Sequence, residues 1–210
     1  MRLRFFGQVI ACFLYFVCVS SQAVTPQGWV IGVGSGYANT DWGYLTSNID
    51  FLNASVPDKA IDGGVPLRGF VFRSLNAYWG VEASVELLPE VKLHFTTENN
   101  YPKISGKDVW ISSYTQRGDL LLEFMAPFSH SRFYGFSDLG LNLTHRDDLI
   151  ANLWRWGPAF GAGLGYLTRG ADFSMGFLYT TGFAKSEPLP ANDYIPFAYD
   201  IYFDYGMKIA

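Results

Sequence analysis

The sequence predicts an all-β fold, an eight-stranded antiparallel up-and-down transmembrane β-barrel. Three observations lead to this prediction. Apolar and polar residues alternate with period two in eight segments of about ten residues, longer than the strands of about five or six residues common in soluble domains. The connections between these segments alternate between long and short. Aromatic residues reach 18% of the 210-residue chain, a high share that suits a wall facing lipid.

Residues 1–23 are expected to be a cleaved secretory signal. Two arginines precede an apolar run at 9–19, and small residues follow where a signal peptidase reads. The run is shorter than the roughly 20 residues of a spanning helix, which argues against a membrane anchor. Both cysteines, Cys12 and Cys18, would leave with the signal. Residues 24–210 would then form the barrel without disulfides or thiolate metal ligands.

Each of the eight segments sets large apolar residues on one face against small or charged residues on the other. The segments are residues 28–37, 65–74, 77–87, 115–126, 132–143, 157–167, 171–182 and 197–210. The first and the sixth alternate apolar residues with glycine. The second sets Leu and Val against Arg68 and two phenylalanines, and the third sets Trp79 and valines against glutamates. In the fourth and fifth, leucines oppose charged residues, and in the last two, aromatics oppose aspartates.

The connections predict which end of the barrel faces outward. Long polar connections are expected at 38–62, 89–114, 144–156 and 183–196, and tight turns at 74–76, 127–131 and 168–170. Outer-membrane barrels have short turns at the periplasmic end and longer loops outside. The tight turns are therefore expected to face the periplasm.

The alternation fits either lipid or water outside the barrel, and two arguments favour lipid. In lipid every backbone group must be paired, and a closed barrel achieves this without an exposed edge. A soluble ligand-binding barrel also alternates, but its apolar face turns inward and its polar face must be solvated. Here the polar face is rich in Gly, Ala and Ser and poor in Lys, which would make a poorly soluble surface. We therefore expect apolar side chains outside and polar side chains inside.

Aromatic residues near the segment ends predict belts at the two membrane interfaces. The predicted lipid-facing aromatic residues are Trp29, Tyr37, Trp79, Tyr166, Tyr179, Phe197, Tyr199, Phe203 and Tyr205. For Trp110, Trp154 and Trp156, ordinary packing is expected instead.

The polar face predicts a charge network inside the barrel. It comprises Arg68, Glu82, Glu86, Arg117, Asp119, Glu123, Arg132, Asp138, Asp172, Asp200, Asp204 and Lys208. Buried charges are tolerated when they are paired. Strand order and height predict three contacts: Arg68 with Glu82, Arg117 with Glu86, and Asp172 with Lys208. Such a network would fill and rigidify the interior.

Four stretches resemble a known group of proteins. They are GWVIGVGSGYANTDW, RFYGFSDLGLNL, GPAFGAGLGY and the last strand, and they resemble small outer-membrane barrels similar to the transmembrane domain of OmpA and its OmpW-like and opacity-protein relatives. The resemblance covers nearly all of residues 24–210. It implies a place in the outer membrane of a Gram-negative bacterium, contact with its lipid and lipopolysaccharide, and a charge network that blocks or gates the lumen.

The sequence leaves three functions open. A structural or surface-recognition role, adhesin-like or receptor-like, would use the long outer loops to bind an extracellular ligand or a host surface. OmpW-like relatives suggest passage of small hydrophobic compounds through a lateral opening, and Pro66 and Pro158 interrupt strand pairing near the outer end. A lipid A-modifying enzyme would need a serine beside one of the three histidines, His94, His130 and His145, and no spacing brings such a pair together.

Enzymatic activity, a cofactor and a metal site are not expected. The three histidines lie far apart in the sequence, and the mature chain would have no thiol. The formal net charge is −4 and there is no basic run, so nucleic acid is not an expected partner.

Overall fold

The structure is a computed structural model that describes residues 25–42, 57–99, 101–128, 131–183 and 193–209. Within these residues ten strands form one antiparallel sheet. They are β1 (Trp29–Asp41), β2 (Lys59–Ile61), β3 (Leu67–Ser74), β4 (Trp79–Leu87), β5 (Val91–Phe95), β6 (Val109–Pro127), β7 (Phe133–Asp148), β8 (Asn152–Leu167), β9 (Ala171–Thr180) and β10 (Phe197–Ile209). The expected signal, residues 1–23, lies outside the described residues. No described helix is long and apolar enough to cross a membrane.

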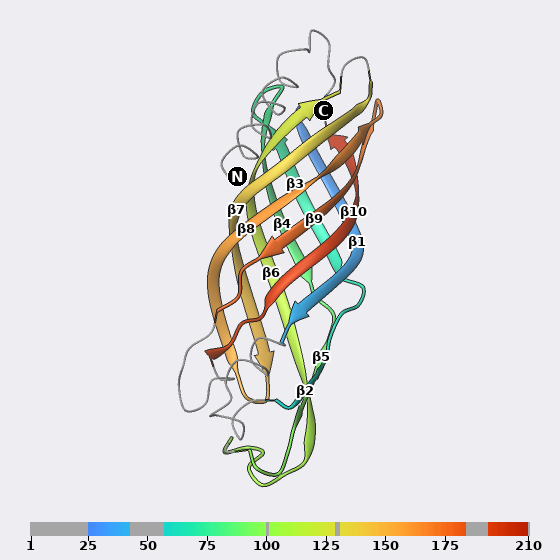
Figure 1. The fold of residues 1–210 in the computed structure, drawn as a ribbon. Coiled ribbons are helices and arrows are strands. Elements are labelled where there is room, and N and C mark those ends of the chain that lie inside the picture. Colours follow the sequence, from blue (N-terminus) through green and yellow to red (C-terminus); the bar gives the residue numbers. More distant parts are fainter. Residues whose placement is uncertain (1–24, 43–56, 100, 129–130, 184–192, 210) are drawn as a thin grey trace, which may run out of the picture.

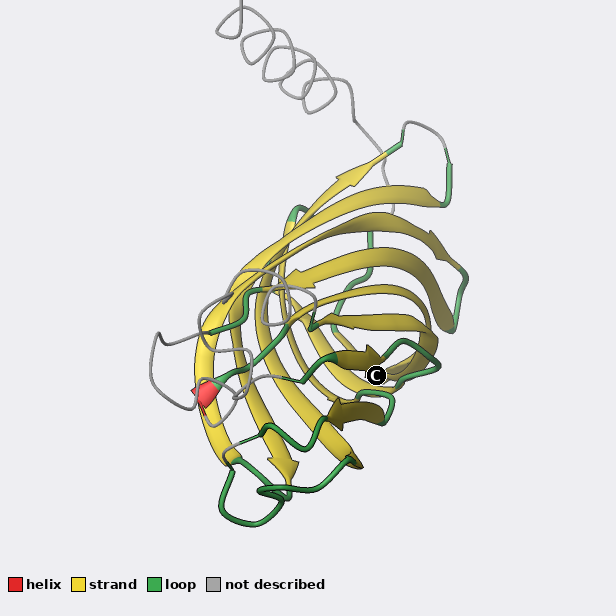
Figure 2. Ribbon diagram, turned by 60° about the horizontal axis from the view of Figure 1, so that its bottom comes forward, coloured by secondary structure: helices red, strands yellow, loops and turns green. Residues whose placement is uncertain are grey.

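Eight of the strands close into a barrel, which Figure 1 shows from the side and Figure 2 after a turn toward one end. The order around the barrel is β1, β3, β4, β6, β7, β8, β9 and β10, and β10 pairs with β1 over its full length, from Phe197↔Asp41 to Ile209↔Trp29. Every neighbouring pair is antiparallel. The predicted eight-stranded up-and-down barrel is therefore confirmed.

Three strands are longer than is needed to cross the membrane. β6 has 19 residues and β7 and β8 have 16 each, whereas about ten residues cross the hydrocarbon. The long connection expected at 144–156 is therefore wrong, because strands occupy most of it and only residues 149–151 form a turn. Beyond the bilayer the outer face no longer has to be apolar, so the alternation that marks the membrane-spanning part does not mark these extensions.

The connection expected at 89–114 also contains strands. β5 pairs with the outer part of β6, from Val91↔Ser113 to Phe95↔Val109, and β2 pairs with β5. We call β2, β5 and residues 109–114 of β6 the outer extension. It projects from one end of the barrel (Figure 1). The three tight turns, at 75–78, 128–132 and 168–170, lie at the opposite end.

The barrel wall turns its large apolar residues outward. All nine aromatic residues expected to face lipid lie on the outward face and are exposed or half-buried. Trp110, Trp154 and Trp156 are also outward and are 45%, 53% and 70% exposed. The ordinary packing expected for these three tryptophans is therefore wrong: they lie in the outer parts of β6 and β8, where the sequence pattern predicted loops.

One interior glycine holds two strands at close approach. A Cβ atom at Gly140 of β7 would lie 2.0 Å from the carbonyl oxygen of Leu120 and 2.9 Å from the Cα of Leu121. These are backbone atoms of β6, so they cannot rotate away. By contrast, a Cβ at Gly69 of β3, on the outward face, would meet nothing within 4 Å.

We expect Gly140→Val to destabilise the barrel, because the added side chain must push β6 and β7 apart. Overpacking of this kind costs about 1–3 kcal/mol. The free energy of unfolding, measured by urea titration in detergent micelles with tryptophan fluorescence, should fall by that amount. The matched control Gly69→Val should change it by no more than about 0.5 kcal/mol. Equal effects of the two substitutions would contradict the close approach at Gly140.

Candidate functional site

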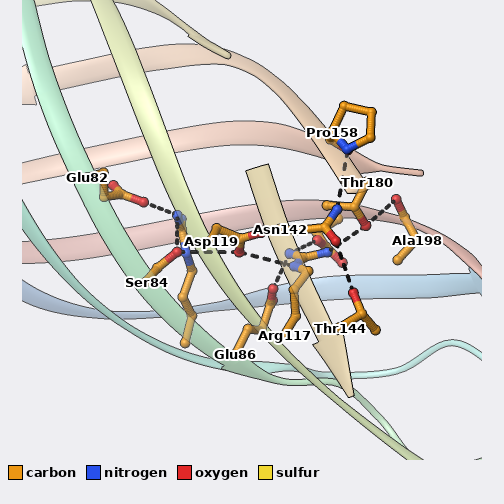
Figure 3. Close-up of polar contacts among 12 residues, drawn as sticks. Glu82, Ser84, Glu86, Arg117, Asp119, Asn142, Thr144, Pro158, Thr180 and Ala198 are labelled. Carbon is orange, nitrogen blue, oxygen red and sulfur yellow. Dashed lines mark hydrogen bonds and ion pairs between the residues drawn. The ribbon is translucent and has the colours of Figure 1, made fainter. Parts of the chain in front are cut away.

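The centre of the barrel interior is filled by a layer built on Arg117. Its side chain is 1% exposed and forms ion pairs with Glu86 of β4, Asp200 of β10 and Asp119 of β6, the last at 3.1 Å from Nε to Oδ2 (Figure 3). Its Nη1 donates to Thr180 Oγ1 of β9 at 3.3 Å. One guanidinium thus connects strands from opposite sides of the lumen.

A second layer, closer to the tight turns, is built on Arg68 of β3. Its guanidinium pairs with Glu82 and, at 2.6 Å, with Asp204, and it lies 4.4 Å from the centre of the Tyr202 ring. Ser84 Oγ donates to Asp119 at 3.4 Å and accepts from Arg68 at 3.4 Å, so it links the two layers (Figure 3). The two layers therefore form one continuous network through the middle of the barrel.

Aromatic side chains fill the interior between these layers and the tight turns. The buried cluster there contains Phe70, Phe72, Tyr134, Phe136 and Tyr202. Tyr134 donates to Asp172 Oδ2 at 2.7 Å. The cavity among these residues has a volume of about 10 Å³, which is room for about one water molecule. In this part of the interior, buried aromatic rings lie beside the charged layers.

The outer end of the interior has a hydrophobic core of its own. The buried members of this core are Trp42, Val91, Leu93, Phe95, Tyr101, Ile104, Ile111 and Tyr194. Arg146 of β7 lies beneath it, with its guanidinium 4.7 Å from the Trp42 ring, 2.6 Å from Asp148 and 2.8 Å from the Tyr194 carbonyl oxygen. This core joins the outer extension to the barrel.

The structure brings together most of the residues expected in the charge network, with two corrections. Arg132 is not inside the barrel: it lies exposed in the turn before β7. The expected ion pair of Asp172 with Lys208 is wrong as well, since Asp172 accepts from Tyr134 and no described carboxylate lies within ion-pair distance of the Lys208 ammonium. Glu123 and Asp138 face each other across β6 and β7, and neither forms an ion pair within the described residues.

The alternation already placed two phenylalanines on the inward face with Arg68, but the aromatic layer that they form with Tyr134, Phe136 and Tyr202 was not predicted, and neither was the Arg146 layer. Tyr134, Phe136 and Tyr202 share the inward parity of the aspartates on the same strands. The alternation in the sequence could therefore have placed them inside. Arg146 and Asp148 lie in the outer part of β7, where the sequence pattern predicted a loop.

His94 of β5 forms hydrogen bonds to two carboxylates and so links separate segments of the outer extension. Its Nδ1 lies 2.5 Å from Asp58 Oδ1, just before β2, and its Nε2 lies 2.7 Å from Asp108 Oδ1, just before β6. The ring also lies 4.7 Å from that of Trp110. The hydrogen bond to Asp58 has the largest effect on the pKa of His94 and raises it. Burial opposes this effect, the hydrogen bond to Asp108 adds to it, and the net result is a raised pKa. Lys59 lies opposite His94 in the β2–β5 ladder and Lys92 lies on the same strand.

Neither described histidine is arranged for nucleophilic catalysis. His94 is bonded to the two aspartates, and His145 stacks on Trp154 at 4.1 Å and bonds Asn152 at 3.3 Å. The nearby serines are engaged elsewhere, Ser112 with Glu90 and Ser113 with Asp148. His130 lies outside the described residues. Among the residues the structure describes, no group of three metal-ligating side chains is close enough to hold a metal ion.

The ladder between β8 and β9 stops short of the outer end of β8. It runs from Ala159↔Thr180 toward the tight turns, and among the described residues Asn152–Pro158 has no strand partner on that side. Thr181 N donates to the Pro158 carbonyl oxygen at 3.2 Å, and Arg155 bonds Asp193 at 3.0 Å. The β1–β3 ladder is interrupted after Ser35↔Leu67, next to Pro66, and pairing resumes at the bridge between Ala38 and Gly64. Both expected interruptions of pairing thus coincide with a proline.

Comparisons with known proteins agree with this architecture. No family model and no curated protein matches the chain. The structure is similar to the outer membrane protein OprG from Pseudomonas aeruginosa, with 18% sequence identity, a TM-score of 0.53, and coverage of 87% of this chain and 97% of that chain. It is similar to the N-terminal β-barrel domain of OprF from the same organism, with 11% identity, a TM-score of 0.50, and coverage of 87% and 98%. The predicted resemblance to small outer-membrane barrels is confirmed as a likeness of fold.

Removal of the Arg117 charge should destabilise the barrel, because Glu86, Asp119 and Asp200 would remain buried without their partner. We expect Arg117→Met to lower the free energy of unfolding in detergent by about 3–5 kcal/mol. Adding Asp119→Asn and Asp200→Asn should recover part of this loss. The control Arg155→Met, which removes a half-buried pair with Asp193, should cost no more than about 1 kcal/mol. If both arginine variants lost the same stability, Arg117 would not organise the interior.

The His94 contacts predict a pH dependence confined to the outer extension. Because the pKa of His94 is raised above its unfolded value of about 6.5, its stabilising effect is complete below about pH 6.5 and is lost as the pH rises through the folded pKa. The NMR titration midpoint of the His94 ring should therefore lie above about 6.5. Asp58→Asn with Asp108→Asn should return it toward that value. A wild-type midpoint at or below the unfolded value would show that the two carboxylates do not hold the charged ring.

Proposed function

We propose that the chain is an outer-membrane barrel with a closed interior, and that it serves surface recognition through its outer extension. The observation that carries the proposal is the hydrophobic core at the outer end, built on Trp42, Phe95 and Tyr194, which holds β2, β5 and β6 in place above the barrel. A passive membrane anchor would need no ordered structure there. Recognition sites are typically presented on rigid scaffolds.

The filled interior supports a role other than diffusion through the lumen. The Arg117 and Arg68 layers, the aromatic layer and the outer core follow one another along the barrel axis, and their side chains are buried. An eight-stranded barrel has room for side chains but not for an aqueous channel. The closed interior leaves the outer surface and the lipid-facing wall as the places where the protein acts.

The outer extension presents aromatic side chains to the surroundings. Trp110 is 45% exposed and Tyr114 is 54% exposed on the outward face of β6. Counted from the tight turn, both lie beyond the roughly ten residues of β6 that cross lipid. Exposed Trp and Tyr are the residues most enriched at binding hot spots. We propose this face as the contact with an extracellular ligand or a host surface, and the apolar wall as the contact with outer-membrane lipid and lipopolysaccharide.

A non-enzymatic role agrees with the geometry at the histidines. His94 is held by two aspartates and His145 by Asn152 and Trp154. A nucleophilic serine needs a base within hydrogen-bond reach, and the serines near these rings bond to carboxylates instead.

The recognition role predicts that Trp110→Ala with Tyr114→Ala weakens attachment of cells. Bacteria producing this variant should bind cultured epithelial monolayers several-fold less than those producing the wild type, since the loss of two hot-spot aromatics costs at least about 1–2 kcal/mol each. Trp154→Ala with Trp156→Ala, nearer the membrane on β8, is the matched control. Heat-modifiable gel mobility checks that each barrel is folded. Unchanged attachment of the Trp110 and Tyr114 variant would refute the role of this face.

A second function, passage of small hydrophobic compounds through the wall, is favoured by the unpaired edge of β8. Thr181 and Gly157 lie against each other at this edge, and a Cβ on Gly157 would be 2.8 Å from Thr181 Oγ1. Gly157→Cys with Thr181→Cys should therefore form a disulfide that closes the edge. If the edge opens for transport, uptake of a hydrophobic fluorescent probe into proteoliposomes should fall on oxidation and recover on reduction. Equal uptake in both states would exclude this route.

A further inference from the structure

The lipid-facing wall contains an apolar hollow near the tight turns. It has a volume of about 270 Å³, and its lining includes Phe124, Ala126, Phe128, Gly135 and Ala162. Ala126, Gly135 and Ala162 are outward positions on three consecutive strands, β6, β7 and β8. Where these strands approach the middle of the membrane, their outward residues are mostly Leu and Phe. The small residues therefore make a depression in an otherwise even wall.

The packing of the barrel itself does not require Gly135 to be a glycine. A Cβ atom at Gly135 would lie 3.7 Å from the nearest carbon of Phe128 and 3.9 Å from two backbone oxygens, which are ordinary contact distances. Phe124, which lines the hollow, packs against Trp79 at 4.9 Å, and Phe133, two residues from Gly135, packs against Tyr166 at 4.8 Å. The depression thus interrupts the aromatic belt at this end, and the space is open to a molecule from the lipid.

Cationic side chains surround the same end of the barrel. Arg73, Arg132 and Arg169 are exposed there; Arg73 lies 4.9 Å from the Trp29 ring, and the described residues supply no ion-pair partner to Arg132 or Arg169. Asp172, the described carboxylate at this end, faces the interior and bonds Tyr134. Arg132 is three residues from Gly135, a separation of about 10 Å along a strand. An arginine side chain and a lipid headgroup together can span this distance.

We propose that the hollow binds one acyl chain of an anionic phospholipid, whose headgroup phosphate pairs with Arg132 and Arg169. Lipid tails are as apolar as the wall, so the driving force is close packing in the hollow together with attraction between the phosphate and the guanidinium groups. The proposal rests on the orientation in the proposed function, in which the tight turns face the periplasm and therefore the phospholipid leaflet.

Native mass spectrometry of the purified barrel in detergent tests the proposal. With equal amounts of phosphatidylglycerol and phosphatidylcholine of the same chain length, the wild type should retain one phosphatidylglycerol with a preference of about thirtyfold, as expected from two arginines near the headgroup. Gly135→Leu fills the hollow and should lower retention of both lipids. The control Ala83→Leu enlarges an outward residue on β4, away from the hollow, and should bind as the wild type does.

The arginines are tested separately from the hollow. Arg132→Gln with Arg169→Gln should abolish the preference for phosphatidylglycerol while retention of phosphatidylcholine persists. Lys92→Gln with Lys107→Gln removes the same charge from the opposite end and should leave the preference unchanged. Heat-modifiable mobility verifies that each variant is folded.

Three results would overturn the proposal: unchanged lipid retention by Gly135→Leu, equal retention of the two phospholipids by the wild type, or displacement of phosphatidylglycerol by purified lipid A at equal concentration. The measurement does not depend on how the barrel is oriented in a cell or on what its outer end binds. Failure here would therefore leave the recognition proposal standing, and loss of cell attachment would leave the lipid site standing.

Discussion

The structure depends on the requirement that each backbone N–H and C=O in lipid has a partner within the protein. A single hairpin or an open sheet would leave an edge unpaired, at a cost of several kcal/mol per group. The pairing of β10 with β1 removes the last edge. Once the barrel is closed, the alternation of side chains along each strand divides the residues into a lipid-facing set and an interior set, and one slip of register would exchange the two.

Closure creates a second problem, because an eight-stranded cylinder must be filled. Arginine is well suited to fill it, since its guanidinium has five donors and a long apolar stem. Arg117 reaches carboxylates on β4, β6 and β10, and Arg68 reaches β4 and β10. Carboxylates from several strands therefore point at one shared cation. The network does not need to add stability over an apolar filling; it fixes which strands face each other, since a shifted strand would leave a buried charge unpaired.

Much of the membrane-spanning part could be predicted from the sequence, whereas the outer end could not. Between Trp79 and Leu87, or Phe197 and Ile209, lipid imposes an apolar face, so the alternation is clear. In the outer part of β6 both faces carry polar or mixed residues, and the strand is held by β5 and by a core assembled from distant segments, including Trp42 and Tyr194. Contacts of such long range leave no local pattern. Arg132 was wrongly expected inside the barrel because the alternation was continued back to residue 132. β7 begins only at Phe133, and Arg132 lies in the turn before it.

The two ends of the barrel face different physical demands, and this explains where the structure varies. At the tight-turn end, connections of a few residues leave little room for anything but cations and aromatic rings at the interface. At the outer end, water can satisfy backbone groups, so β8 can continue along Asn152–Pro158 beyond its described ladder with β9, and β6 can leave the barrel to pair with β5. Departure from the regular barrel is therefore tolerated only beyond the lipid. Any surface specific to this protein is expected to be built there, on strands whose inner halves are fixed by the membrane.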